Sequence, residues 1–277
     1  MMGVQLRLLA WFVSLATLLS GCVPATRLDE VATDRPAQSS SAPAAARDNV
    51  PAPHRTASPT PTSVATPPPA PKPAPAPKPF ALNLYQEGDF VPQYTFEWCV
   101  AASIQMMHNL IDRTGARTWT DRVQQGELWE MARARSSNSF NGANPLGWAE
   151  VLTKVGMGPY RVVSIAHYEE ALRTAARAIA DTGRPVGLVM WRGRHVWVMS
   201  GFASLGDPDK FPKFSVTGIR VQDPLYPYGD DRWGPSPVPN ALLTPQQLAT
   251  QFVVREPRRW SSNLPTGYML VLPVSKA

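Results

Sequence analysis

The sequence predicts an α+β domain in which a group of helices precedes an antiparallel sheet. Apolar residues recur at helical spacing in several segments between residues 99 and 182. Beyond Pro185 the spacing changes to the two-residue alternation of strands. Roughly half of the 30 prolines lie before Phe80, so we place the folded domain at residues 80–277. That length is enough to bury a sizeable core.

The first predicted helix begins at Cys99. Its core-facing stripe consists of Val100, Ile104, Met107 and Ile111. The exposed N–H groups and the dipole at a helix N-terminus favour a thiolate, which is the form of cysteine that attacks carbonyl carbon. Gln93 lies six residues earlier, and a folded loop could aim its side-chain amide at the same place as an oxyanion donor. The alternative is a small buried cysteine that begins a core helix.

The remaining elements follow from caps, turns and periodicity. The further predicted helices run from Thr118 to Arg135, from Pro145 to Gly156, from Tyr168 to Gly183 and from Pro245 to Phe252. The inner side of the helix that ends at Arg135 is predicted to carry Val123, Leu128 and Met131. The predicted strands cover residues 160–164, 186–191, 195–202, 214–222 and 268–272. The loops 136–145 and 226–239 separate these elements, and the second could form either a cleft wall or a compact surface loop.

Residues 1–21 resemble a bacterial lipoprotein signal peptide, with Arg7 in the n-region and an apolar run too short for a comfortable bilayer span. The run ends in Leu19-Ser-Gly-Cys22, which is similar to a lipobox. In that family the cysteine is acylated and becomes the mature N-terminus. The resemblance implies a lipid anchor at Cys22 on the extracytoplasmic face of a bacterial membrane. An ordinary signal peptide, giving a secreted protein, is the alternative.

Residues 22–79 are dominated by Pro, Ala, Ser and Thr, a composition that predicts a disordered and partly extended stalk. The net charge is +6, but Lys and Arg are scattered, and no basic stripe interleaved with aromatics indicates nucleic-acid binding. With Cys22 reserved for the anchor, Cys99 is a free thiol outside the cytoplasm. Such a thiol is a liability unless it is buried or used.

A thiolate nucleophile needs a base, usually histidine, and a third group that orients the base. His54 lies in the stalk, His108 is too far along the Cys99 helix to reach the sulfur, and His167 stands at a helix start. His195 begins a strand, and Asp223 stands at the end of the next one. Antiparallel pairing would bring these two side chains together. A structural histidine and an Asx turn are the alternatives. Weaker acidic candidates, all in loops, are Asp207, Asp209, Asp230 and Asp231.

The order of these residues resembles the papain-like cysteine peptidase superfamily, and within it the group of bacteriocin-leader-processing (double-glycine) peptidases. The matching segments are Gln93, Trp98-Cys99-Val-Ala-Ala-Ser103, His195-Val-Trp-Val-Met-Ser-Gly201 and Val221-Gln-Asp-Pro-Leu225. The resemblance implies a papain-like fold, with Cys99 as nucleophile, His195 as general base, Asp223 as its orienting group and Gln93 in the oxyanion hole. The chain has no transporter portion, which leaves a leader-peptide substrate open.

The resemblance implies a membrane-tethered thiol hydrolase that cleaves peptide bonds without a metal or cofactor. We expect a peptide or protein substrate, a monomer, and no nucleic-acid partner. Two rival hypotheses stay open at this point. One is a binding or adaptor module at the cell surface that keeps the fold without turnover, and the other is a cell-wall peptide amidase or transpeptidase.

Overall fold

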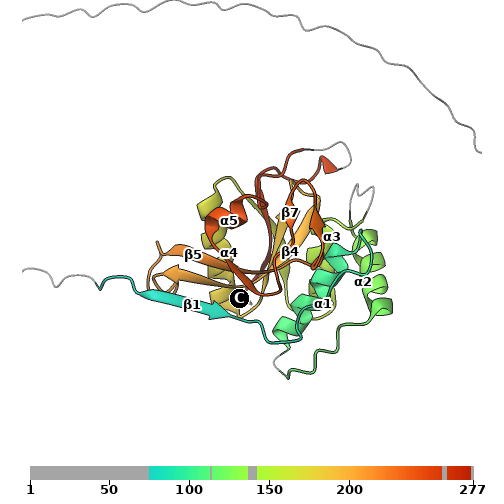
Figure 1. Ribbon diagram of the computed structural model, residues 1–277, viewed down its shortest axis with the longest axis horizontal. Helices are drawn as coiled ribbons and strands as arrows, with labels where there is room; N and C mark the ends of the chain where they lie inside the picture. Colours follow the sequence, from blue (N-terminus) through green and yellow to red (C-terminus); the bar gives the residue numbers. More distant parts are fainter. Residues whose placement is uncertain (1–74, 113, 137–141, 258–260, 276–277) are drawn as a thin grey trace, which may run out of the picture. The chain divides into compact units, whose positions relative to one another are not determined.

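The computed structural model describes residues 75–112, 114–136, 142–257 and 261–275 (Figure 1). These residues form an α+β fold, in which N-terminal helices, including the one that begins at Cys99, pack on a C-terminal antiparallel sheet. The predicted fold class is confirmed. The predicted signal peptide, the lipidated Cys22 and the stalk up to residue 74 lie outside the described residues, so these predictions stay predictions.

The described helices are α1 (Cys99–Ile111), α2 (Arg122–Ala134), α3 (Pro145–Lys154), α4 (Tyr168–Thr182) and α5 (Pro245–Ala249). Four begin at the predicted residue, whereas α2 begins at Arg122 instead of Thr118, because the Asp121 side chain caps it by accepting from the Gln124 N–H. The Asn144 side chain caps α3 by accepting hydrogen bonds from two N–H groups of its first turn. Thr244 and Gln247 form the predicted capping box of α5. Gly183 ends α4 in the left-handed conformation, with φ of 62°.

The strands form one seven-stranded sheet and one small hairpin. They are β1 (Pro79–Asn83), β2 (Tyr160–Ile165), β3 (Val186–Met190), β4 (His195–Leu205), β5 (Ser215–Gln222), β6 (Gly229–Asp230), β7 (Gly234–Pro235), β8 (Ala241–Leu243) and β9 (Tyr268–Pro273). The order in the large sheet is β2-β9-β3-β4-β5-β8, with β1 paired to β4. The sequence did not predict β1, β6, β7 or β8. The strand β1 directly follows the proline-rich run, which conceals its alternation.

Strand β4 organises the sheet because three other strands pair with it. It pairs antiparallel with β3, with β5 and, through its C-terminal part, with β1. In the β4–β5 pair Val198 lies opposite Gln222, so the start of β4 lies beside the end of β5. The antiparallel pairing that we predicted for His195 and Asp223 is confirmed.

One prediction for α2 is wrong. Val123 is 70% exposed, whereas Leu128 is buried as predicted and Met131 is partly buried. The inner face of α2 includes a polar residue instead, because the amide of Gln125 donates a 2.7 Å hydrogen bond to the buried Gln105 side chain on α1. A buried amide that has a hydrogen-bond partner costs little free energy of folding. The positions of the apolar residues alone therefore predict the wrong inner face for α2. In Figure 1, α1, α2 and α3 lie together beside the sheet.

Candidate active site

His195 and Asp223 form a buried pair at one end of the sheet. His195 is the first residue of β4, and Asp223 directly follows β5. The Nε2 atom of His195 lies 2.6 Å from Oδ1 of Asp223, and the two residues are 4% and 0% exposed. The Leu225 N–H also donates to this oxygen at 2.9 Å. The carboxylate is therefore fixed from two sides, and it holds the imidazole ring in one orientation.

Cys99 is the first residue of α1 and its free thiol is half-buried. The preceding residue, Trp98, makes no side-chain hydrogen bond to the first turn of α1. The first N–H groups of a helix have no intrahelical partner, so they and the helix dipole act on whatever stands at this end. The thiol lies close enough to His195 to contribute to the raised pKa of its imidazole. Because Asp223 engages Nε2, Nδ1 is the ring nitrogen left for the sulfur.

The surroundings of His195 change its acidity. Burial lowers the pKa of this imidazole, but the hydrogen bonds with Asp223 and Cys99 outweigh burial and raise the pKa to about 9. The imidazole is therefore positively charged at neutral pH. A cation in contact with a cysteine sulfur is one of the environments that make a thiol reactive.

Gln93 lies next to the acidic member of the site. Its backbone N–H donates to the carbonyl of Pro224, the residue after Asp223, at 2.8 Å. Its side-chain amide donates to the carbonyls of Thr95 and Phe96 at 2.9 and 3.1 Å, which shapes the loop that leads into α1. Both bonds engage the amide nitrogen within the loop, so the oxyanion role of Gln93 stays a prediction.

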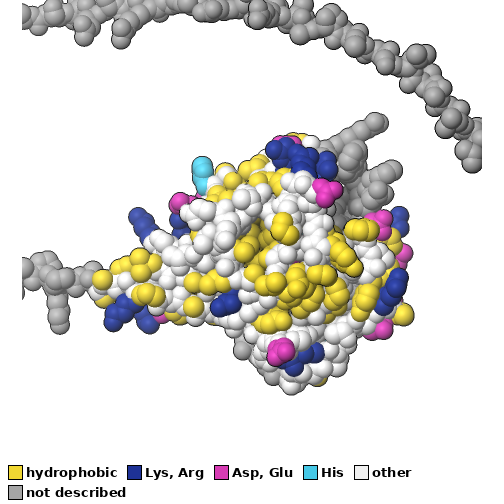
Figure 2. Space-filling view, viewed as in Figure 1, with side chains coloured by type: hydrophobic (Ala, Val, Ile, Leu, Met, Phe, Trp, Pro, Cys, Tyr) yellow, Lys and Arg dark blue, Asp and Glu magenta, His cyan; other side chains and the backbone are white. Residues whose placement is uncertain are grey.

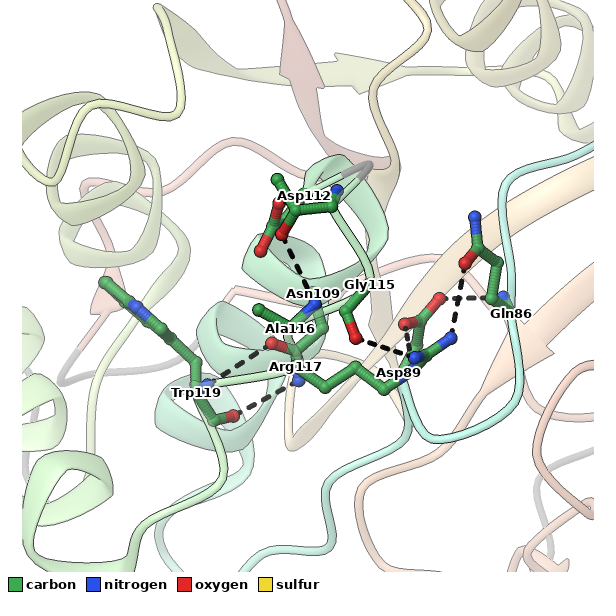
Figure 3. A network of polar contacts seen from close by, with 9 residues as sticks. Gln86, Asp89, Asn109, Asp112, Gly115, Ala116, Arg117 and Trp119 are labelled. Carbon is green, nitrogen blue, oxygen red and sulfur yellow. Dashed lines mark hydrogen bonds and ion pairs between the residues drawn. The ribbon is translucent and has the colours of Figure 1, made fainter.

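A buried ion pair clamps the start of this loop (Figure 3). Asp89 is 3% exposed and its carboxylate lies 3.3 Å from Nε of Arg117, in the connection between α1 and α2. The Gln86 N–H donates to the same carboxylate at 2.7 Å, and Arg117 also donates to the carbonyl of Gly115 at 2.8 Å. Burial raises the pKa of Asp89, although the Gln86 N–H and Arg117 each lower it. The segment that carries Gln93 is thus fixed to the connection between α1 and α2.

We expect Arg117→Met to lower the free energy of unfolding by about 2 kcal/mol, because it leaves the buried Asp89 carboxylate without its cation. Chemical denaturation at pH 7 measures the effect. Lys154→Met, which removes an exposed cation at the end of α3, is the matched control and should change the stability by less than about 0.5 kcal/mol. Equal losses in the two variants would contradict a structural role for the Asp89–Arg117 pair.

Sequence reasoning missed a tryptophan that covers the histidine. The Trp191 ring stacks on His195 with a centroid distance of 4.2 Å and an interplanar angle of 25°. Its Nε1–H donates to Oε1 of Gln251 at 2.8 Å, and its backbone N–H donates to the Gln251 carbonyl at 3.0 Å. Trp191 has a φ of 54°, a strained value for a bulky residue, and such strain persists where the surroundings fix it. Trp233, in the loop 226–239, stacks parallel to Trp191 at 6.4 Å.

An aromatic residue four positions before His195, in a hairpin turn, is the one sequence signal that could have indicated Trp191. Nothing near Gln251 in the sequence points to the site. The loop 226–239 contains the hairpin of β6 and β7, and its Trp233 packs toward the site.

The other candidates lie elsewhere. His108 stacks on Trp119 with a centroid distance of 4.1 Å, and His167 is exposed at the start of α4. Asp207 pairs with Lys210 at 2.9 Å. His54 is outside the described residues. In the part of the chain that the structure describes, no group of three or more potential ligands could hold a metal ion. None of the helices described there has the length and apolar composition that a bilayer crossing requires.

Comparison with protein families gave no matching family model, and no curated protein matches the sequence. The fold and the site describe an α+β domain in which His195 is bonded to Asp223 and lies near the Cys99 thiol.

Proposed function

We propose that this protein is a papain-like thiol hydrolase that cleaves peptide bonds through Cys99, His195 and Asp223. The observation that carries the proposal is the position of His195, which is bonded to Asp223 and lies close enough to Cys99 for the thiol to act on the pKa of the imidazole. Covalent acyl transfer requires a nucleophile, a base and an orienting group that follow one another in space in this order.

The reaction follows from these contacts. The Cys99 sulfur attacks the carbonyl carbon of a peptide bond, with its proton passed to His195. The negative charge that develops on the carbonyl oxygen is placed next to the free N–H groups at the start of α1. His195 then donates its proton to the leaving amine. Water, giving a proton to His195, attacks the carbonyl carbon of the thioester, and the C–S bond breaks to release the acid and restore the Cys99 sulfur. Asp223 keeps the imidazole oriented and stabilises its positive charge throughout.

Exposed apolar residues near the site favour a peptide substrate. Phe96, three residues before Cys99, is 86% exposed, and Tyr228, in the loop that follows Asp223, is 72% exposed. Figure 2 shows hydrophobic side chains gathered on the face of the molecule in view, with most of the charged side chains near its margin. We further propose that the domain acts as a monomer on the extracytoplasmic side of a bacterial membrane, tethered through Cys22.

Cleavage of a broad peptide library by the full chain tests the proposal. We expect cleavage by the wild type and none by Cys99→Ala, which keeps the size and burial of the site but lacks the nucleophile. Mass spectrometry of an acyl-enzyme trapped on Cys99 would identify the intermediate. Peptides that are retained equally by both proteins and never cleaved would contradict the proposal and indicate a binding module.

A further inference from the structure

A second concave site lies on α4, apart from the catalytic residues. An open groove of about 470 Å³ lies between α4, the β2–β9 pair and the segment before β5, and none of the three proposed catalytic residues lines it. On α4 its lining follows one helical face from Glu170 to Asp181. On the sheet it includes Arg161 and Leu272, which lie opposite each other in the β2–β9 register. Two structural elements thus shape one groove.

Three arginines converge on this groove. Arg173 and Arg177 are four residues apart on α4 and therefore lie on the same face, one turn from each other. Arg161 adds a third guanidinium from β2. Arg173 has one long ion pair, at 3.9 Å to the exposed Glu169. Among the described residues no ion pair joins Arg161 or Arg177 to a carboxylate. At least two guanidinium groups of the groove therefore keep their capacity for an anion.

The floor and the ends of the groove restrict the ligand. Phe214 and Leu272 form the buried floor, at 3% and 4% exposure, and the Arg177 guanidinium lies 5.4 Å from the centre of the Phe214 ring, which helps to fix it. The two carboxylates in the lining, Glu170 and Asp181, stand eleven positions apart on α4 with the two arginines between them. The two arginines of α4 thus lie in the middle of its face, with one carboxylate beyond each end.

We propose that this groove binds the phosphate group of a ligand. Guanidinium groups bind phosphate oxygens through paired, charge-assisted hydrogen bonds, which suits an arrangement of several arginines better than a single anion-binding lysine. The same phosphate chemistry occurs in a phospholipid headgroup and in a soluble phosphate. The site is independent of the thiol chemistry proposed above.

Titration calorimetry with the full chain tests the proposal with two probes. Inorganic pyrophosphate represents soluble phosphate, and a short-chain phosphatidylglycerol below its micelle concentration represents a lipid headgroup. We expect the double variant Arg173→Gln/Arg177→Gln to bind the probe that the wild type binds about tenfold more weakly, or not at all. The matched control is Arg122→Gln/Arg133→Gln, which removes the same charge from exposed positions of α2 and should bind like the wild type.

Each outcome decides the question. Loss of pyrophosphate binding in the groove variant alone supports a soluble phosphate ligand, and selective loss of phosphatidylglycerol binding supports a lipid headgroup. Equal weakening in the groove and control variants would show that net charge, and not the groove, attracts the anion, and would overturn the proposal. Failure of the wild type to bind either probe would also overturn it. Thermal unfolding of both double variants checks that the fold is intact.

Discussion

Asp223→Ala should reduce peptide hydrolysis by about three orders of magnitude, because it removes the group that orients the base and stabilises its charge. The variant also leaves the buried Nε2 of His195 and the Leu225 N–H without their acceptor. Burial is the largest influence on the pKa of His195, and it lowers the pKa. Without Asp223, the main group that raises the pKa would be missing. The imidazole would become neutral at pH 7, and the rate of peptide hydrolysis should fall across the neutral pH range.

The same pair has a measurable effect on stability. His195 has a folded pKa of about 9 against an ordinary value of 6.5, a difference that corresponds to about 3 kcal/mol. Since the folded pKa is the higher one, this stabilisation is complete below pH 6.5 and is lost as the pH rises through about 9. We expect the wild type to lose stability in this window relative to Asp223→Ala. Parallel pH profiles of the two proteins would contradict the proposed pair.

Asp223→Asn separates charge from hydrogen bonding. The asparagine keeps an oxygen that can accept from Nε2 of His195, but it carries no negative charge. Its hydrolysis rate should lie between those of the wild type and Asp223→Ala. An asparagine variant as inactive as the alanine variant would indicate that the charge, and not orientation, supplies the whole effect.

Trp191→Ala should lower the free energy of unfolding by about 3 kcal/mol, because it removes a buried ring and leaves a cavity beside His195. It should also reduce hydrolysis, since one face of the imidazole would lose its packing and admit water. Trp191→Phe keeps a ring on His195 and loses only the Nε1–H bond to Gln251, so it should cost about 1 kcal/mol. Denaturation and steady-state kinetics measure the two effects.

The pH profile distinguishes positioning from mere packing. If Trp191 positions His195, Trp191→Ala changes the pH dependence of hydrolysis, while Trp191→Phe restores that of the wild type. Gln251→Leu, which leaves the indole N–H unpaired but in place, should lose stability and keep the wild-type profile. A Trp191→Ala enzyme that is only less stable, with an unchanged pH profile, would contradict the positioning role.

The sequence was sufficient for the parts of the site that local patterns determine. The apolar stripe after Cys99 predicted α1, and the ends of two consecutive strands predicted that His195 and Asp223 meet. These predictions succeed because helix periodicity and antiparallel pairing leave few alternatives. The position of Cys99 beside His195 depends on how α1 packs on the sheet, and for it the sequence offered only a resemblance.

Contacts between distant residues had no local signal. Trp191 adopts a backbone conformation that opposes its own preference, so no propensity predicts it. The Asp89–Arg117 pair joins two loops that are distant in the sequence. On α2, the buried Gln125 amide lies on the inner face and Val123 is exposed. Each depends on tertiary packing, which overrides local preference.

The rate at which iodoacetamide alkylates Cys99 in the full chain, measured from pH 5 to pH 10 by mass spectrometry of the Cys99 peptide, tests the central claim most directly. The account predicts that Cys99 reacts readily at pH 6 to 7 in the folded wild type. In His195→Ala the rate at these pH values should be at least tenfold lower and should rise only near the ordinary thiol pKa of about 8.5. A Cys99 that is inert at neutral pH, or that reacts identically with and without His195, would contradict the account.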